Sequence, residues 1–210
     1  MWSKASTCWY GKVPLLAALA VCHAADTPPR KLCEFAGFEN PKIAIVASRK
    51  PVTGYFGCSP DSKCLAATLR PGDPLVIYGT EGDWTCGYHE DAGGAAAVWV
   101  PSSMLRPVEP EPAPSLDAWV GQWRYGEDHV TIKRAGNELQ MSGDAVWHGL
   151  GQNVHTGEFS GKATPAGNRG HYVEGECTID FALIGNFLVL NDNSHCGGVN
   201  VRFWGIWRRQ

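Results

Sequence analysis

The 210-residue chain carries 18 Lys and Arg against 21 Asp and Glu, a formal net charge of -3. Proteins that bind nucleic acid concentrate positive charge to displace counterions, so this balance argues against a nucleic-acid partner. Only 19% of the residues are charged, whereas the chain has 25 Gly, 8 Cys and 9 Trp, a composition typical of secreted β domains. It has no apolar run of ~20 residues, so no transmembrane anchor is predicted.

The first 24 residues have the pattern of a bacterial signal peptide. Lys4 and Lys12 form a basic start, residues 13–21 are apolar, and small residues follow up to Ala24 and Ala25. We therefore predict cleavage after one of these alanines and a location in the periplasm or outside the cell. A lipid on Cys22 is the alternative.

Cleavage there leaves six cysteines, and export implies an oxidising compartment in which disulfides form. Four of them precede residue 87 and two follow residue 176, so we expect each half of the chain to pair internally. The spacing leaves other connectivities open. The chain has no Cys-x-x-Cys pair, which argues against a zinc site and leaves no metal predicted. The expected disulfides are Cys33–Cys86, Cys58–Cys64 and Cys177–Cys196.

A proline-rich segment, residues 109–115, divides the remaining chain into two predicted domains, 25–108 and 116–210. Proline lacks a backbone donor and favours extended chain, so we interpret the segment as a semi-rigid spacer between separately folded units. Both halves consist of short runs of β-forming residues between Gly and Pro turns, and neither shows a helical apolar stripe. The predicted fold class is all-β.

The first half resembles a bacterial SH3-like domain over about residues 40–108. The resemblance rests on the Gly72-Asp73 turn, the apolar strand after it, the Gly82-Asp83-Trp84 strand, Trp99-Val100 and the closing Leu105. It implies a small β-barrel that binds peptidoglycan peptides or contacts other proteins.

Three aromatic residues of this half are the candidate ligand-binding residues: Tyr55, Trp84 and Tyr88. Flat aromatic faces give a large contact area at low entropic cost. Tyr55 lies in a glycine-flanked segment and Tyr88 leads into a long Gly-rich turn, so we expect both to be exposed. The alternative for Trp84 is a place in the core, where we also expect Trp99.

The second half opens with Trp119-Val-Gly-Gln-Trp123 and contains about seven further strand candidates before its last strand. An early Gly-x-Trp and a basic residue on the last strand resemble lipocalin-like barrels, in which an Arg packs across the Trp at the closed end. About 95 residues suit eight short strands, so we predict an antiparallel up-and-down barrel of eight strands.

From Cys177 to Arg208 the chain resembles the C-terminal part of uncharacterised exported bacterial proteins, some of them grouped with lysozyme-inhibitor-type envelope proteins. The resemblance brings no established chemistry. Asp192 between two asparagines could bind calcium, but a single carboxylate is a poor calcium cage, and we interpret the segment as a turn.

No catalytic pattern emerges. The chain lacks a Gly-x-Ser-x-Gly elbow, a His-Glu-x-x-His pair and a phosphate-binding glycine loop. The carboxylate pairs Glu127-Asp128 and Glu174 with Glu176 could in principle serve glycoside hydrolysis, but on exposed strands such pairs are normally solvated charges. We predict no enzyme, no catalytic residues and no cofactor.

Three hypotheses of function follow. The favoured one is a non-enzymatic cell-envelope protein that recognises a cell-wall peptide or glycan, or an envelope protein, through its SH3-like domain. The second is an inhibitor or immunity protein that blocks a wall-degrading enzyme. The third is a small-molecule carrier that uses the interior of the C-terminal barrel. The inhibitory loop of the second hypothesis is His148, Gly149, Gly151 and Asn153.

Overall fold

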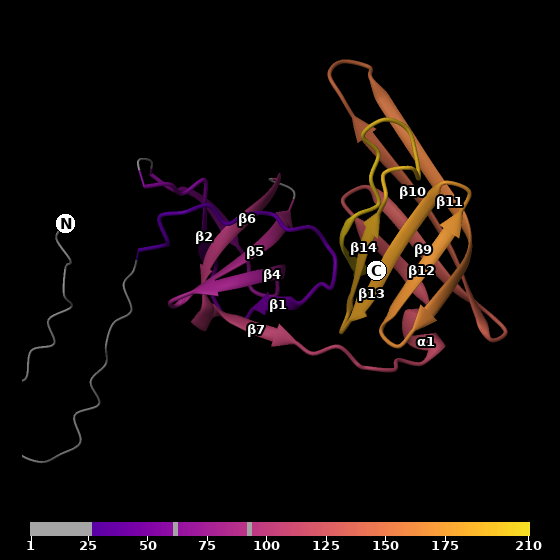
Figure 1. The fold of residues 1–210 in the computed structure, drawn as a ribbon, viewed down its shortest axis with the longest axis horizontal. Helices are drawn as coiled ribbons and strands as arrows, with labels where there is room; N and C mark the ends of the chain where they lie inside the picture. Colours follow the sequence, from indigo (N-terminus) through magenta and orange to yellow (C-terminus); the bar gives the residue numbers. More distant parts are fainter. Residues whose placement is uncertain (1–26, 61–62, 92–93) are drawn as a thin grey trace, which may run out of the picture.

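The computed structural model describes residues 27–60, 63–91 and 94–210. It consists of an antiparallel sheet and an antiparallel closed barrel, joined by one extended segment, and contains very little helix (Figure 1). The predicted all-β fold is confirmed. Within the described residues, no helix has the length and apolarity needed to cross a bilayer.

The first unit is a seven-stranded sheet with the order β3-β2-β6-β5-β4-β1-β7. A short 3-10 turn, Ser102–Met104, precedes its last strand. Residues of β2, β4 and β6 pack in a small apolar core, and the consecutive buried residues in β4 and β6 show that both faces of the sheet are covered there. The strands are β1 (Ile43–Val46), β2 (Val52–Phe56), β3 (Leu65–Leu69), β4 (Pro74–Glu81), β5 (Trp84–Asp91), β6 (Gly94–Pro101) and β7 (Leu105–Val108).

The hairpin between β4 and β5 shows how the sequence sets the strand pairing. Glu81 pairs with Trp84, so only Gly82 and Asp83 form the loop. Gly82 has a φ of 55°, and two-residue hairpin loops require such a positive φ. This turn fixes the register that places Trp84 opposite Pro101 on the neighbouring strand.

The second unit is a closed barrel of eight strands in up-and-down order. The last strand pairs with the first, which removes the open edges of the sheet. The prediction of an eight-stranded antiparallel barrel is confirmed. Its elements are α1 (Leu116–Trp119), β8 (Gly121–Tyr125), β9 (Asp128–Ala135), β10 (Glu138–His148), β11 (Val154–Ala166), β12 (Arg169–Glu174), β13 (Cys177–Ile184), β14 (Phe187–Asp192) and β15 (Gly205–Arg209).

Large aromatic side chains fill the barrel. Trp119, Trp123 and Trp207 are completely buried, together with Phe203. At the closing seam, the guanidinium of Arg209 lies 4.4 Å above the ring of Trp123 and donates hydrogen bonds to the backbone oxygens of α1 and the residue after it. An Arg across the early Trp is the contact that the lipocalin-like resemblance implied.

The six cysteines of the described residues form the three expected pairs: Cys33–Cys86, Cys58–Cys64 and Cys177–Cys196. The first ties the N-terminal segment to β5. The third ties the start of β13 to the loop that follows β14. Each disulfide lies within one half of the chain.

The two units share a buried apolar interface. Residues on the outer face of the barrel, Ala182, Ile184, Val189 and Ile206, pack against residues of the first unit that include Val76 and Tyr88. Polar contacts flank this interface, with Arg208 3.2 Å from Asp73 and Arg169 2.6 Å from Asn40. The proline-rich segment therefore connects two units that pack together, rather than holding them apart (Figure 1).

Candidate functional site

The aromatic residues predicted to bind ligand divide between two environments. Tyr55 on β2 and Trp84 on β5 meet edge to face, with their ring centroids 5.7 Å apart. Together they line an open groove of about 540 Å³. Tyr55 is half-buried, whereas Trp84 is only 8% exposed and packs in a core cluster with Trp99, so most of its ring lies in the core and little of it faces the groove. We call this hollow the aromatic groove; Pro51, Thr53, Pro101 and Met104 also line it.

The chemistry of the aromatic groove is amphipathic. Its walls are apolar, its hydroxyls come from Ser48, Thr53, Tyr55 and Ser103, and Asp83 is the one charged residue that lines it. Met104 is 38% exposed on the groove side of the 3-10 turn, where its flexible thioether can adapt to a ligand. Such a surface suits a neutral or weakly cationic ligand with flat or ring-shaped faces.

Tyr88 does not join this groove, and its expected exposure is wrong. Its side chain is 8% exposed, because the register of β5 places it beside Val76 on the face that packs against the barrel. The ring contacts Phe35 and Phe38, and its hydroxyl donates a 2.7 Å hydrogen bond to Glu90. Burial raises the pKa of this phenol above its ordinary value, with a further contribution from Glu90.

Trp99 lies where the sequence analysis placed it, in the core. It is 3% exposed, and its indole N–H donates a 2.9 Å hydrogen bond to the backbone oxygen of Lys31. The N-terminal segment therefore covers one face of the sheet and is fixed there by this bond and by the Cys33–Cys86 disulfide.

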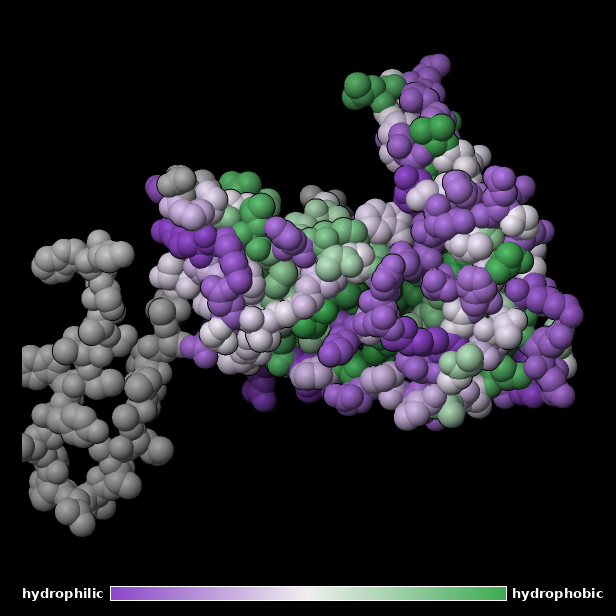
Figure 2. Space-filling view, in the orientation of Figure 1, coloured by the Kyte–Doolittle hydropathy of each residue, from purple (hydrophilic) through white to green (hydrophobic). Residues whose placement is uncertain are grey.

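The predicted inhibitory loop forms the tip of the β10–β11 hairpin. This hairpin extends beyond the end of the barrel, and its tip carries hydrophobic surface (Figures 1 and 2). Leu150 at the tip is 97% exposed and Val154 is 48% exposed. No charged residue lies between His148 and His155. The hairpin therefore presents an uncharged, convex knob to solvent.

Several contacts brace the tip of the hairpin. Gly149 donates a 2.8 Å backbone hydrogen bond to Asn153, which closes the loop. The Trp147 ring lies against the His155 ring at 5.2 Å and covers Gly149 so closely that a Cβ there would come within 2.6 Å of the indole. His148 lies 2.8 Å from the Glu127 carboxylate. The loop is thus held in one shape by residues on both strands.

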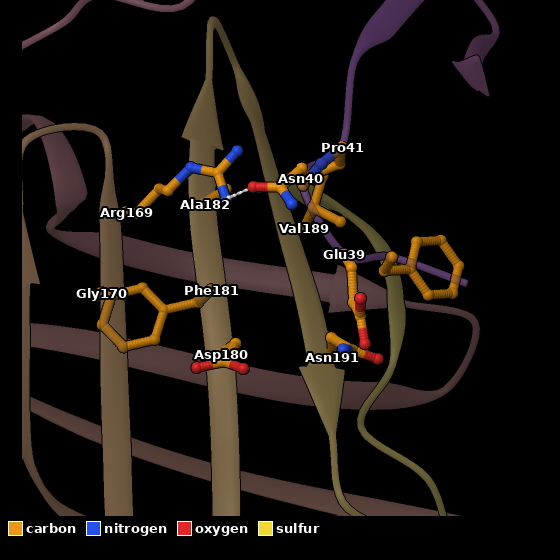
Figure 3. Close-up of a pocket in the computed structure, with 11 residues that line it drawn as sticks. Glu39, Asn40, Pro41, Arg169, Gly170, Asp180, Phe181, Ala182, Val189 and Asn191 are labelled. Carbon is orange, nitrogen blue, oxygen red and sulfur yellow. Dashed lines mark hydrogen bonds between the residues drawn. The ribbon is translucent and has the colours of Figure 1, made fainter. Parts of the chain in front are cut away.

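A pocket between the two units was not anticipated from the sequence. It has a volume of about 340 Å³ and lies where residues 38–41 cross the outer face of β12, β13 and β14 (Figure 3). Arg169, Asp180, Asn191 and Glu39 supply its polar groups. The alternation of polar residues along β12 and β13 hints at an outer face, but only the pairing of the strands and the crossing of residues 38–41 assemble the pocket.

Among the described residues, no group of three or more His, Cys, Asp and Glu side chains could hold a metal ion. The two carboxylate pairs are engaged separately, because Glu127 faces His148 while Glu174 accepts the hydroxyl of Tyr172 at 2.6 Å. The absence of catalysis and of a cofactor stays a prediction.

Two half-buried carboxyl groups have raised pKa values. Burial raises the pKa of Asp128 to about 6, against the opposing effect of a hydrogen bond from the Val146 N–H, and the neighbouring acids add to the rise. Burial also raises the pKa of Asp192, although it accepts a hydrogen bond from the Ser194 N–H in the turn. This hydrogen bond of Asp192 lies within a turn, which agrees with the interpretation of residues 191–193 as a turn rather than a calcium site.

No family model, no curated protein and no solved structure matches the chain. The resemblances to SH3-like domains, to lipocalin-like barrels and to exported envelope proteins therefore stay predictions. The functional argument depends on the aromatic groove, the hairpin tip and the pocket between the units.

Proposed function

We propose that this protein is a non-enzymatic, exported cell-envelope protein that recognises cell-wall peptide or glycan through the aromatic groove of its first unit. The observation that carries the proposal is the Tyr55–Trp84 pair, which forms an edge-to-face corner in an open groove. The apolar walls and hydroxyls suit both faces of a sugar ring and the backbone of a peptide. The three disulfides are compatible with export.

Removal of the Tyr55 ring is the first test. Tyr55→Ala should weaken co-sedimentation with purified peptidoglycan by about 5- to 100-fold, because exposed aromatic residues typically contribute 1–3 kcal/mol to binding. Tyr55→Phe keeps the aromatic face and should retain most of the binding. Leu65→Ala, on β3, is the control for removal of an exposed apolar side chain at a residue outside the groove.

Failure of the wild-type protein to sediment with peptidoglycan would contradict the proposal. The same conclusion would follow if Tyr55→Ala and Leu65→Ala bound equally well. Thermal melts of each variant establish that the comparison is between folded proteins.

A second candidate function is inhibition of a wall-degrading enzyme by the hairpin, and the exposure of Leu150 favours it. An uncharged convex tip can enter an active-site cleft without the cost of desolvating a charge. A braced loop also loses little conformational entropy on binding. The third hypothesis, a carrier with a ligand inside the barrel, has no such support because aromatic side chains fill the interior.

The inhibitor hypothesis is tested at the tip residue. The protein should protect cell walls from a muramidase or amidase of the same organism, and Leu150→Asp should raise the inhibition constant at least 10-fold, since it places a charge in the contact. Leu65→Asp introduces the same charge on an exposed strand residue elsewhere and should change nothing. Equal inhibition by both variants would exclude the hairpin as the inhibitory element.

A further inference from the structure

The pocket between the units has an ordered arrangement of charge. Its floor consists of two rows of residues in register across three barrel strands. Arg169, Ala182 and Val189 form one row, and His171, Asp180 and Asn191 form the other. Arg169 and His171 are two residues apart on one strand, so the rows are about 6.6 Å apart. One row therefore carries the Arg169 guanidinium, and the other carries the Asp180 carboxylate with His171 beside it.

The segment above the floor reinforces this polarity. Asn40 accepts a 2.6 Å hydrogen bond from the Arg169 guanidinium, which fixes the guanidinium at one end of the pocket. Glu39 lies at the other end, near Asn191 and on the same side as Asp180 (Figure 3). Negative charge from two elements of the chain therefore gathers opposite a single positive charge.

Most of the hydrogen-bonding capacity in the pocket is unused. Arg169 has five N–H groups and uses one of them on Asn40. Asp180 accepts an N–H from His171 at 2.6 Å through one oxygen, which leaves its second oxygen available. Within the described part of the chain, the structure gives no hydrogen bond to the side chains of Glu39 and Asn191. These groups are free to bind a ligand.

We propose that this pocket binds a dipeptide with free amino and carboxyl ends. The carboxylate binds the fork of Arg169, which matches its planar geometry. The ammonium lies between Glu39 and Asp180, and the Asn191 amide bonds the central peptide group.

The size and lining of the pocket narrow the class of dipeptide. A volume of about 340 Å³ accepts two residues with small side chains. Ala182 and Val189 lie between the charged ends and are almost completely buried, so the apolar surface that they offer to a ligand is small. We therefore expect alanine-like side chains to bind better than bulky or charged ones. This site is separate from the aromatic groove and does not depend on the function proposed above.

Titration of the full chain with alanyl-alanine, followed by NMR shifts of the Ala182 and Asn191 amides, tests the proposal directly. The free dipeptide should give saturable shifts. N-acetylated and C-amidated alanyl-alanine, each of which removes one end charge, should bind at least 10-fold more weakly. Single alanine, which lacks the central peptide group that the Asn191 amide would bind, should also bind at least 10-fold more weakly.

Two substitutions locate the effect. Arg169→Gln and Glu39→Gln should each weaken binding at least 10-fold, and both residues are exposed enough to be replaced without disturbing the core. Arg134→Gln removes an exposed arginine of the barrel that pairs with Asp117 and should leave binding unchanged. Equal binding of the blocked dipeptides, or no saturable shift with alanyl-alanine, would overturn the proposal without any variant. An equal loss in Arg134→Gln would show that the attraction is not specific to this pocket.

Discussion

At the scale of single residues, Asp128 shows most clearly how burial alters chemistry. Its carboxyl lies at the start of β9, half-buried, beside the acids Glu127 and Asp144. It accepts a 2.9 Å hydrogen bond from the Val146 N–H and so ties β9 to the far part of β10. Both the ionised and the protonated carboxyl can accept the Val146 hydrogen bond, whereas the charge of the ionised form is poorly solvated. The residue therefore stabilises the hairpin base better when it is protonated.

Asp128→Asn should stabilise the protein at neutral pH and leave it unchanged in acid. The pKa of the folded state, about 6, lies above the ordinary value of 3.8, so the folded state holds the proton more tightly than the unfolded state. Its stability contribution therefore falls as pH rises through this window. Because solvent screens a half-buried group, we expect Asn to add about 1 kcal/mol at pH 7.5, or roughly 2–4 °C in Tm.

Thermal melts of both proteins at pH 3 and pH 7.5 provide the measurement. The two melting temperatures should coincide at pH 3, below the unfolded pKa of 3.8, and separate at pH 7.5. The account of Asp128 fails if the variant is less stable at pH 7.5, since the carboxylate would then be a net stabilising charge. Glu176→Gln, at an exposed acid in the β12–β13 turn that does not contribute to the Asp128 shift, is the control for general relief of negative charge.

At the scale of elements, the disulfides and the hairpins determine how firmly each segment is held. The Cys177–Cys196 bond closes a loop over a sequence separation of 19, between the start of β13 and the segment after β14. Asn193 supports the same junction, because its side chain accepts the N–H of Thr178 at 3.2 Å and donates to the backbone oxygen of Glu176 at 2.7 Å. This long loop therefore packs against the barrel instead of moving freely.

Replacement of both cysteines by serine should lower the free energy of unfolding by about 3 kcal/mol, according to the chain-entropy estimate for a loop of this length. Denaturant unfolding of the wild type and the double variant measures the difference. The Cys58–Cys64 disulfide closes a loop over a separation of only 6. Replacement of these two cysteines by serine should therefore lower the free energy of unfolding by less, roughly 2 kcal/mol. A larger loss for the shorter loop would show that native packing, not chain entropy, dominates.

Sequence reasoning reached the elements of the barrel because their signals are local. The Gly-x-Trp opening, turns such as Ile184-Gly185-Asn186 and the cysteine spacing lie within short stretches, and each is realised in the structure. The aromatic groove was predicted in part, because two of the three residues named from the sequence, Tyr55 and Trp84, are in contact there. Tyr88 was misplaced because exposure of a strand residue depends on what covers its face.

The packing of the two units had a sequence signal of a different kind. Residues 181–184 of β13 form an unbroken apolar run, and all four are buried. A strand with one solvated face alternates, whereas a continuous apolar run indicates that both faces are covered. The run could have predicted that something covers the outside of the barrel. It could not have identified β4 and β5 as the cover, because that depends on contacts distant in the sequence.

At the scale of the whole molecule, the shared interface makes the two units depend on each other. Val189 is 2% exposed, although it lies on the outer face of the barrel, because the first unit covers it. Val189→Glu buries a charge there and should separate the units or unfold the protein, with a loss of several kcal/mol. Val173→Glu places the same charge on an outer barrel position that is 56% exposed and should be nearly neutral.

Limited proteolysis of the 109–115 segment measures the separation of the units. Cleavage should accelerate strongly in Val189→Glu and remain at the wild-type rate in Val173→Glu. The isolated residues 116–210 should likewise associate or precipitate, because their outer apolar face loses its cover. A stable, monomeric fragment of these residues would contradict the shared core.

The fixed packing of the units also has a consequence for multivalent binding. The aromatic groove and the hairpin tip belong to different units, yet the shared core sets the distance and angle between them. A large partner that binds one of these two surfaces would find the other already held at a fixed position, because the units do not move on a flexible linker. The second contact would then form as an intramolecular step. When both surfaces reach the partner, two weak contacts give high avidity. If both surfaces bind as proposed, a partner whose geometry does not match would be denied the second contact, and the protein would discriminate between targets by their shape.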